Sequence, residues 1–347
     1  MTPKLHLHVL ASGSGGNATV IEGPAGSVLV DCGISRRELM RRAEAEGVDL
    51  GRVRAVLLTH EHIDHTKGLE VLSRHFDGAF VSTAGTVGAR RGLAELPWTL
   101  VDHDETFAIA DTGIVVRAFP TSHDVADPMG FRFSAVDADG EETDAIGYCT
   151  DTGYLTDEAA YALRGCRILG LEANHDVAML RDGDYPGFLK ARVGGERGHL
   201  SNAQAAEALP DLVTDETETV VALHLSEHNN RPSVCVRTLA AAVGAEPVSL
   251  PEARTPAGRP HERVVAPRYP PAFSALSWAI LLTSSPRSHV RRIIYACPIL
   301  NRVGLASQRS LYVLHPVRYR EQGWCPFLQE VRRPAPVAVG PDPACHS

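Results

Sequence analysis

Short apolar runs alternate with polar turns along residues 4–242 of the chain. Runs of four to eight residues bounded by Gly, Pro, Asn and Asp predict strands at about 4–10, 18–22, 27–31, 53–58, 79–82, 106–119 with a break at 111–113, 130–136, 145–150, 167–171 and 219–223. Helix-period segments predict helices at about 35–46, 67–75, 185–193, 201–209 and 232–242. Strands interleaved with helices predict an α/β fold in which two sheets pack face to face with helices outside.

The stretch Thr59-His-Glu-His-Ile-Asp-His directly follows the apolar strand at 53–58. In an extended or loop backbone, alternate side chains point the same way, so His60 and His62 are predicted to converge on one ion. Asp64 and His65 would then face a neighbouring position. The spacing therefore predicts a site for two metals, and the alternative is a polar loop with incidental histidines.

Later strands also end in polar clusters. His123 follows the strand pair at 106–119, Asp151 follows the strand at 145–150, and His224 follows the strand at 219–223. A carboxylate at a strand end can bridge two cations, although an Asp at a strand-to-helix turn is also a common cap. In a face-to-face sandwich these strand ends would meet at one rim.

The chain has 347 residues, of which 44% are hydrophobic, and this length and composition are typical of a protein with a substantial core. No charged start followed by an apolar stretch precedes the first strand, and the longest apolar stretch of the tail, residues 275–282, is too short to span a bilayer. The seven Cys include no C-x-x-C pair, which favours reduced thiols. We therefore expect a cytoplasmic protein that has no membrane partner.

Charge is divided unevenly along the chain. Residues 253–347 contain 13 Arg, no Lys and four acidic residues, so residues 1–252 carry 21 basic against 38 acidic side chains, a net charge of −17. An acidic body argues against a broad phosphate-binding surface. The tail also holds 13 of the 23 Pro. We predict a packed domain over 1–252 and a disordered Pro/Arg-rich extension over 253–347, which is a linker, a basic arm for nucleic acid, or a reading-frame artefact.

Five stretches, in order, resemble the metallo-β-lactamase fold superfamily, and within it the YycJ/WalJ branch related to the RNase Z and RNase J nucleases. They are LASGSGGN at 10–17, THEHIDH at 59–65, LEANHDVAML at 171–180, GHLSN at 198–202 and HLSEHNN at 224–230. The resemblance covers residues 4 to about 250 and implies a four-layer αββα metallo-β-lactamase sandwich.

Carried over by position, the resemblance implies seven metal ligands. The first cation would be held by His60, His62 and His123, the second by Asp64, His65 and His224, with Asp151 bridging them. The His-Leu-Ser at 224 resembles the His-Phe-Ser of tRNA-processing relatives, which favours His224 over His228 as the ligand. Histidine and carboxylate ligands without thiolate suit two divalent ions such as zinc or manganese, and also allow iron.

The resemblance also implies a phosphodiesterase that acts on DNA, degrading it from a 5′ end, through a hydroxide shared by the two cations. We expect Asp64 to orient or deprotonate the attacking water, and the non-ligand His199 to stabilise or protonate the leaving oxygen. Arg192 and Arg197 are candidates for local attraction of phosphate. Positions expected to support the ligands or contact substrate are Asn17, His175, Asp176, Ser226, Asn229 and Asn230.

Two other functions stay open at this point. A thioester or lactone hydrolase on the same fold would use the same cations, but it leaves His199 without an obvious task. A non-catalytic binding protein is the more remote alternative, because the predicted ligand set is complete.

Overall fold

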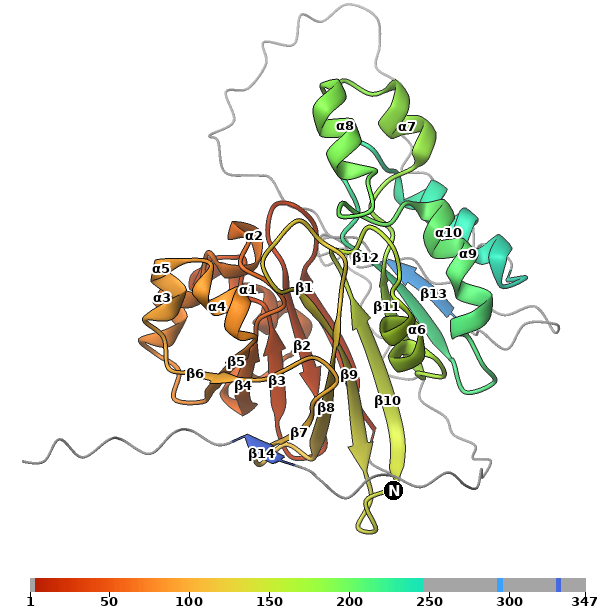
Figure 1. The fold of residues 1–347 in the computed structure, drawn as a ribbon. Helices are drawn as coiled ribbons and strands as arrows, with labels where there is room; N and C mark the ends of the chain where they lie inside the picture. Colours follow the sequence, from red (N-terminus) through yellow and green to blue (C-terminus); the bar gives the residue numbers. More distant parts are fainter. Residues whose placement is uncertain (1–3, 246–291, 296–328, 332–347) are drawn as a thin grey trace, which may run out of the picture.

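The computed structural model describes residues 4–245, 292–295 and 329–331 (Figure 1). Two β-sheets pack against each other, and helices cover their outer faces. The predicted four-layer αββα sandwich is therefore confirmed.

The first sheet is mixed, with the strand order β1-β2-β3-β4-β5-β6. Strands β1 to β3 pair antiparallel, and β3 to β6 pair parallel. Their bounds are β1 His6–Ala11, β2 Ala18–Glu22, β3 Ser27–Val30, β4 Val53–Leu57, β5 Ala79–Ser82 and β6 Trp98–Leu100. Because Val30 lies opposite Leu57 in the parallel pair, the chain leaves β3 and β4 at the same rim.

The second sheet has the order β13-β12-β11-β10-β9-β8-β7-β14. Its strands are β7 Thr106–Ile109, β8 Ile114–Pro120, β9 Met129–Val136, β10 Glu142–Cys149, β11 Ile168–Glu172, β12 Thr219–Leu223, β13 Arg292–Tyr295 and β14 Gln329–Val331. The neighbours β10, β11 and β12 are parallel, with Cys149 opposite Leu171 and Leu171 opposite Ala222. The carboxyl ends of these three strands therefore lie side by side at one rim. Each strand is followed by one of the polar clusters expected from the sequence.

Helices cover the two outer faces and also extend beyond them. On the first sheet lie α1 Arg36–Glu46, α3 Leu69–Ser73, α4 Ala84–Gly88 and α5 Arg91–Ala94, and on the second sheet lie α6 Asp157–Leu163, α9 Asn202–Leu212 and α10 Pro232–Ala242. The short elements η1 Leu50–Arg52 and α2 Ile63–Thr66 flank β4. Helices α7 Val177–Asp182 and α8 Gly187–Val193 project past the end of the sandwich (Figure 1).

Three buried clusters form the core. The largest aromatic side chains, including Phe107, Phe131, Phe133 and Tyr148, pack between the sheets against residues such as Leu57. The other two clusters lie between each sheet and its helices. Each Å² of apolar surface buried in these clusters stabilises the folded state by about 25 cal/mol, and this burial holds the two sheets and their helices together.

One helix prediction was confirmed only in part. The helix expected at 67–75 is present as the shorter α3, Leu69–Ser73, and a further helix, α2, begins before it inside the metal motif, at Ile63. Asp64 and His65 therefore lie in a helical turn, so an extended backbone does not explain where they point. His60 and His62 precede this turn, and His62 is its N-cap residue.

The proposed boundary at residue 252 and the disordered extension fall mostly on residues outside those described. Within the extension, the described segments β13 and β14 add parallel strands to the two edges of the second sheet. Four cysteines, at 32, 149, 166 and 235, are free and buried. Among the described residues, no helix is long and apolar enough to cross a membrane.

Candidate metal centre

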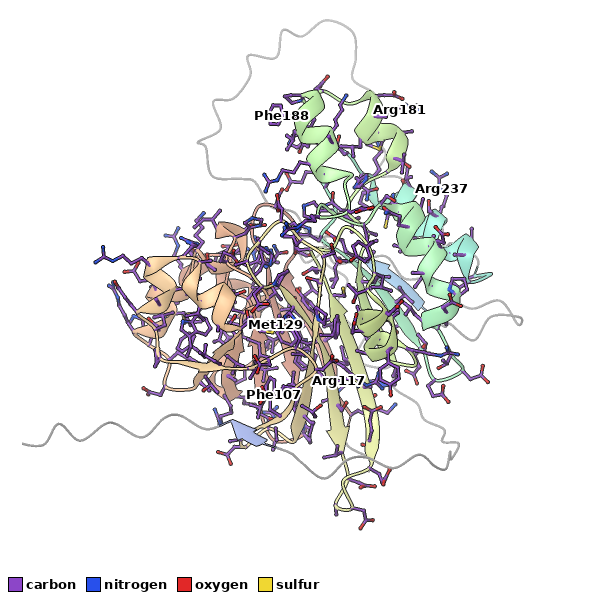
Figure 2. All side chains as sticks on the ribbon, in the orientation of Figure 1. Phe107, Arg117, Met129, Arg181, Phe188 and Arg237 are labelled. Carbon is purple, nitrogen blue, oxygen red and sulfur yellow. The ribbon has the colours of Figure 1, made fainter. Side chains whose placement is uncertain are left out.

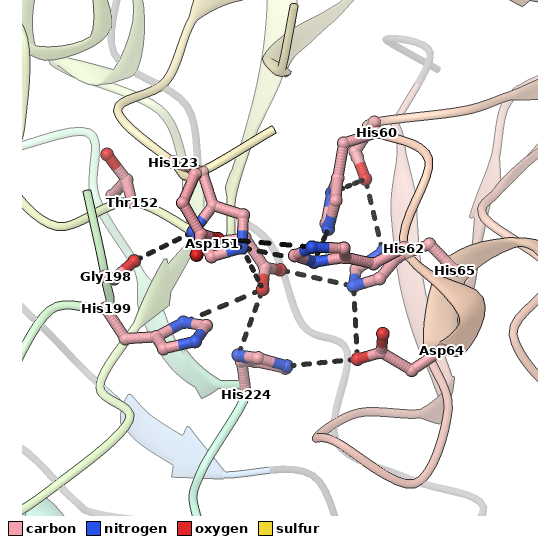
Figure 3. A network of polar contacts seen from close by, with 12 residues as sticks. His60, His62, Asp64, His65, His123, Asp151, Thr152, Gly198, His199 and His224 are labelled. Carbon is pink, nitrogen blue, oxygen red and sulfur yellow. Dashed lines mark hydrogen bonds and ion pairs between the residues drawn. The ribbon is translucent and has the colours of Figure 1, made fainter. Parts of the chain in front are cut away.

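The side chains predicted to hold metal meet at the rim where β3, β4, β8, β10 and β12 end (Figure 3). Three residues there have left-handed backbones, with φ of 60° at Asp31, 57° at Asp151 and 55° at His224. Non-glycine residues rarely adopt this conformation, and such strain clusters at functional sites. Each turns the chain sharply at a strand end, so that its side chain remains at the rim.

His60, His62 and His123 form the first cluster, called group 1 below. His62 Nδ1 lies 3.2 Å from His60 Nε2 and 3.3 Å from His123 Nε2. Two nitrogens that bind one tetrahedral zinc at about 2.0–2.1 Å lie about 3.3 Å apart, so these separations suit ligands of a shared ion. Group 1 therefore has the donor set and the spacing of a metal position.

Asp64, His65 and His224 form the second cluster, called group 2. Asp64 Oδ2 lies 3.6 Å from His65 Nε2 and 3.8 Å from His224 Nε2. His224 Nε2 is buried without a hydrogen-bond partner. A buried polar atom without a partner calls for an explanation, and an ion held by group 2 supplies one.

Asp151 lies between the two groups. One of its oxygens is 3.4 Å from His65 Nε2, and the other is 3.9 Å from His123 Nε2. The oxygen nearer His65, Oδ2, is also buried without a hydrogen-bond partner. This position suits a carboxylate that contacts two ions, and Asp151 is not the N-cap of α6, because Thr156 holds that place.

Two buried carboxylates that sequence reasoning did not assign stand behind group 2. Asp31 Oδ2 lies 2.7 Å from His65 Nδ1. Glu172 Oε1 lies 2.8 Å from His224 Nδ1 and 2.9 Å from His199 Nδ1. Such contacts fix the tautomer and orientation of a ligand imidazole and raise its basicity. A carboxylate at the end of an apolar strand, the signal that identified Asp151, would have found both.

Burial and neighbouring charges shift the pKa values of the buried histidines and carboxylates, and the two effects oppose each other at His65 and Glu172. Burial, followed by the neighbouring imidazoles, holds the pKa of His60 well below its usual value. Burial acts the same way on His65, but the facing carboxylates of Asp31 and Asp151 outweigh it and raise the pKa of His65 to about 9. Burial would raise the pKa of Glu172, yet the adjacent imidazoles of His199 and His224 hold it below its usual value.

The metal clusters open into a pocket of about 320 Å³. His199 lines this pocket beside both groups, with its ring centroid 4.9 Å from that of His123 in group 1 and 5.1 Å from that of His224 in group 2. The His199 backbone is held by a hydrogen bond from its N–H to Val193 O, at 2.9 Å. The structure thus brings the predicted acid to a pocket lined by five of the seven predicted ligands, His62, Asp64, His123, Asp151 and His224, while His60 and His65 are buried beside them.

Of the residues expected to support the ligands, Asn17 lies closest to them. Its Nδ2 is 2.9 Å from His65 Nε2, and its N–H donates to Asp64 O at 2.7 Å. Gly33 permits this approach, because a Cβ on it would lie 1.5 Å from Asp64 O. Asn17 therefore fixes the metal loop against the turn after β1.

The other residues expected to support the ligands make hydrogen bonds that hold the neighbouring loops in place. Asp176 caps α7 by accepting from Met179 N–H at 2.9 Å, and the Ser226 hydroxyl accepts from Asn229 N–H at 3.1 Å. Asn230 Nδ2 donates to the carbonyl oxygens of Ala173 and Asn174. His175 O accepts from Asn202 N–H at 2.8 Å, and Asn202 also exchanges two side-chain hydrogen bonds with Asn230.

Comparison with known proteins agrees with this geometry. Residues 27–225 match the family model described as "Beta-lactamase superfamily domain". The chain is 36% identical over 231 residues to a Bacillus anthracis protein named "Exodeoxyribonuclease YycJ", which covers 65% of this chain and 84% of that protein. It is 33% identical over 229 residues to "Exodeoxyribonuclease WalJ" of Streptococcus pneumoniae, covering 64% of this chain and 82% of that protein.

Among solved structures, the metallo-β-lactamase fold protein YhfI from Bacillus subtilis superposes with a TM-score of 0.53 at 17% identity, covering 70% of this chain and 93% of that one. The fold and the His/Asp clusters together define a metallo-β-lactamase-fold hydrolase. The chain belongs to the beta-lactamase superfamily, and its resemblance to the YycJ/WalJ branch is confirmed.

Proposed function

We propose that this protein is a dinuclear-metal phosphodiesterase that degrades DNA from a 5′ end. The observation that carries the proposal is the Glu172–His199 pair, a positioned acid that shares one pocket with both metal clusters. The two relatives named as exodeoxyribonucleases support DNA as the substrate, since the chain spans 84% and 82% of their length.

The proposed ligands follow the two clusters. Group 1 would hold one cation, group 2 the other, and Asp151 would contact both. Zinc and manganese both suit these oxygen and nitrogen donors. Two divalent cations, when bound, provide a nucleophile at neutral pH and neutralise the charge that develops on the phosphate.

The residues of this chain would perform the remaining tasks. Asp64, which is both a group 2 member and part of the pocket lining, would orient the attacking water. Glu172 accepts from His199 Nδ1, so Nε2 is the ring nitrogen that can reach the substrate and deliver a proton to the leaving oxygen. The Glu172 carboxylate would stabilise the doubly protonated ring that this transfer requires.

The variant His199→Ala tests this role. It should lower kcat on end-labelled DNA by about 10²–10⁴-fold, the typical contribution of a general acid. The loss on bis-p-nitrophenyl phosphate should be much smaller, because p-nitrophenolate leaves without being protonated. Bound metal, measured by elemental analysis, should be unchanged. The control is His75→Ala, which removes an exposed histidine just past the end of α3 and should leave activity intact.

Substrate class is tested separately. Manganese- or zinc-loaded protein is given end-labelled duplex DNA, single-stranded DNA, and a thioester. Release of nucleotides from the 5′ end supports the proposal. Efficient thioester cleavage with no hydrolysis of any nucleic acid would overturn it, and full activity of His199→Ala on DNA would remove His199 from the mechanism.

A further inference from the structure

Helices α7 and α8 carry an apolar surface that the sandwich does not cover. Phe188 on α8 is 77% exposed and Val177 on α7 is 53% exposed. Figure 2 shows Phe188 at the outer end of this pair of helices, on the side of α8 turned away from α7. Single exposed apolar side chains are common on proteins, but a group of them that is continuous with the wall of a pocket marks a binding surface.

Residues at one face of α8 and in the loop before it form a wall of the pocket at the metal centre. Tyr185, Leu189, Arg192 and Val193 line the pocket together with His199. On a helix, residues three and four apart lie on the same face, so Leu189, Arg192 and Val193 present one continuous surface. The pocket therefore has a metal-binding side and a side made largely of apolar and aromatic groups.

The aromatic part of this wall extends beyond the pocket. The Tyr185 ring packs against the exposed ring of His228, with centroids 5.8 Å apart and planes at 52°. Phe188 follows Tyr185 by three residues and lies in the first turn of α8, one helical turn before the pocket residue Arg192. Aromatic side chains are therefore present both in the pocket wall and on the exposed part of α8 next to it.

Hydrogen bonds hold this wall in place. Arg192 Nε donates to Asp124 Oδ2 at 2.5 Å, which joins α8 to the loop that carries His123. Lys190 Nζ donates to Arg181 O at 2.7 Å and joins α8 to α7. Because Arg192 is paired with a carboxylate, its charge is partly neutralised. The net charge of −17 over residues 1–252 also means that the body as a whole does not attract DNA through charge.

We propose that Tyr185 and Phe188 form a stacking platform for the terminal nucleobases of the DNA strand whose phosphate lies at the metal centre. Every base has a flat π-face, so an aromatic platform binds strand ends of any sequence and works without a basic surface. Tyr185 would stack the base next to the scissile phosphate, and Phe188 a base further along the same strand. This inference rests on the proposed function, because it takes DNA to be the substrate.

The experiment compares two oligonucleotides with the same phosphates. One has normal bases, and the other has tetrahydrofuran abasic residues in its first four positions from the 5′ end. Wild-type protein should cleave the normal strand with a kcat/KM about tenfold higher, which lies within the range that stacking of one base on an aromatic ring contributes. Tyr185→Ala should lower kcat/KM on the normal strand about tenfold and leave the abasic strand unchanged.

Further variants separate stacking from structure. Tyr185→Phe keeps the ring and should retain the preference for normal bases, whereas Phe188→Ala should lose part of it, mainly through KM. The matched control is Tyr161→Ala, which removes an exposed tyrosine on α6 whose ring lies over the Arg117 guanidinium, outside the pocket lining. It should behave as wild type on both strands, with circular dichroism and bound metal unchanged in every variant.

The outcomes distinguish the two proposals. If wild-type protein cleaves both strands equally, or Tyr185→Ala slows both by the same factor, the stacking platform is refuted while the phosphodiesterase function stands. If wild-type protein cleaves neither strand but hydrolyses a thioester, the proposed function itself fails and the platform fails with it.

Discussion

The two halves of the candidate metal centre are supported in different ways. In group 1, His60 Nδ1 lies 3.0 Å from the Thr59 hydroxyl and His123 Nδ1 2.9 Å from Gly198 O, both neutral groups. The only carboxylate facing the outer nitrogen of a group 1 histidine among the described residues is that of the 30% exposed Asp124, 4.0 Å from His62 Nε2. In group 2, His65 and His224 each contact a fully buried carboxylate. Both groups have histidines, but only group 2 has buried carboxylates behind them.

This difference has an energetic meaning. Burial keeps the pKa of His60 and His123 below the usual value, so these imidazoles are neutral and ready to bind a cation. In group 2, Asp31 and Glu172 raise the basicity of the rings at the cost of burying two carboxylates. Group 1 is therefore supported mainly by a hydroxyl and a backbone carbonyl, and group 2 by buried carboxylates at the ends of β3 and β11.

The largest effect is expected at Asp31. Its Oδ1 accepts from Thr59 N–H at 2.9 Å while Oδ2 contacts His65, so Asp31→Ala leaves buried partners unpaired. The free energy of unfolding of the metal-free protein, measured by urea denaturation, should fall by about 3–5 kcal/mol.

A matched control is available for this substitution, because Asp104 also has a left-handed backbone, with φ of 63°, but its side chain is 51% exposed. Asp104→Ala introduces the same backbone strain without breaking a buried pair. If Asp31→Ala costs no more stability than Asp104→Ala, the buried carboxylate is not what supports His65.

An intermediate effect is expected at Glu172. The change Glu172→Gln keeps the size of the side chain but removes the charge shared by His199 and His224, and kcat/KM should fall about 10–100-fold. Glu218→Gln is the control, since Glu218 is 40% exposed and pairs with Arg167. Equal activity of the two variants would show that group 2 needs no charge behind it.

The smallest effect is expected on the group 1 side. Arg197 donates to His123 O at 3.1 and 3.0 Å and so holds the loop that carries His123. Arg197→Ala should lower kcat/KM about fivefold, in line with a net hydrogen-bond contribution of about 1 kcal/mol. Arg237→Ala on α10 is the control (Figure 2). A loss as large as that of Glu172→Gln would erase the contrast between the groups.

Much of the fold could be predicted from hydrophobic periodicity. The strands Ala18–Glu22, Ala79–Ser82 and Thr219–Leu223 and the helix Pro232–Ala242 begin and end where the pattern places them. The pattern did not predict β6 or the short helices α4 to α7, which span too few residues to show a period. It also missed α2, because the first turn of α2 starts within the polar motif, where no apolar period marks a helix. The motif itself was visible, but the backbone that orients Asp64 and His65 was not.

The sequence by itself determined which side chains are available and at which strand ends they lie, because strands and ligands are both encoded locally. Only the tertiary structure decided which carboxylate stands behind which imidazole. Asp31 and His65 are 34 residues apart, and Glu172 and His224 are 52 apart. These pairs form because parallel strands end level at one rim, and that register is set by packing of the two sheets over their whole length rather than by any short stretch of residues.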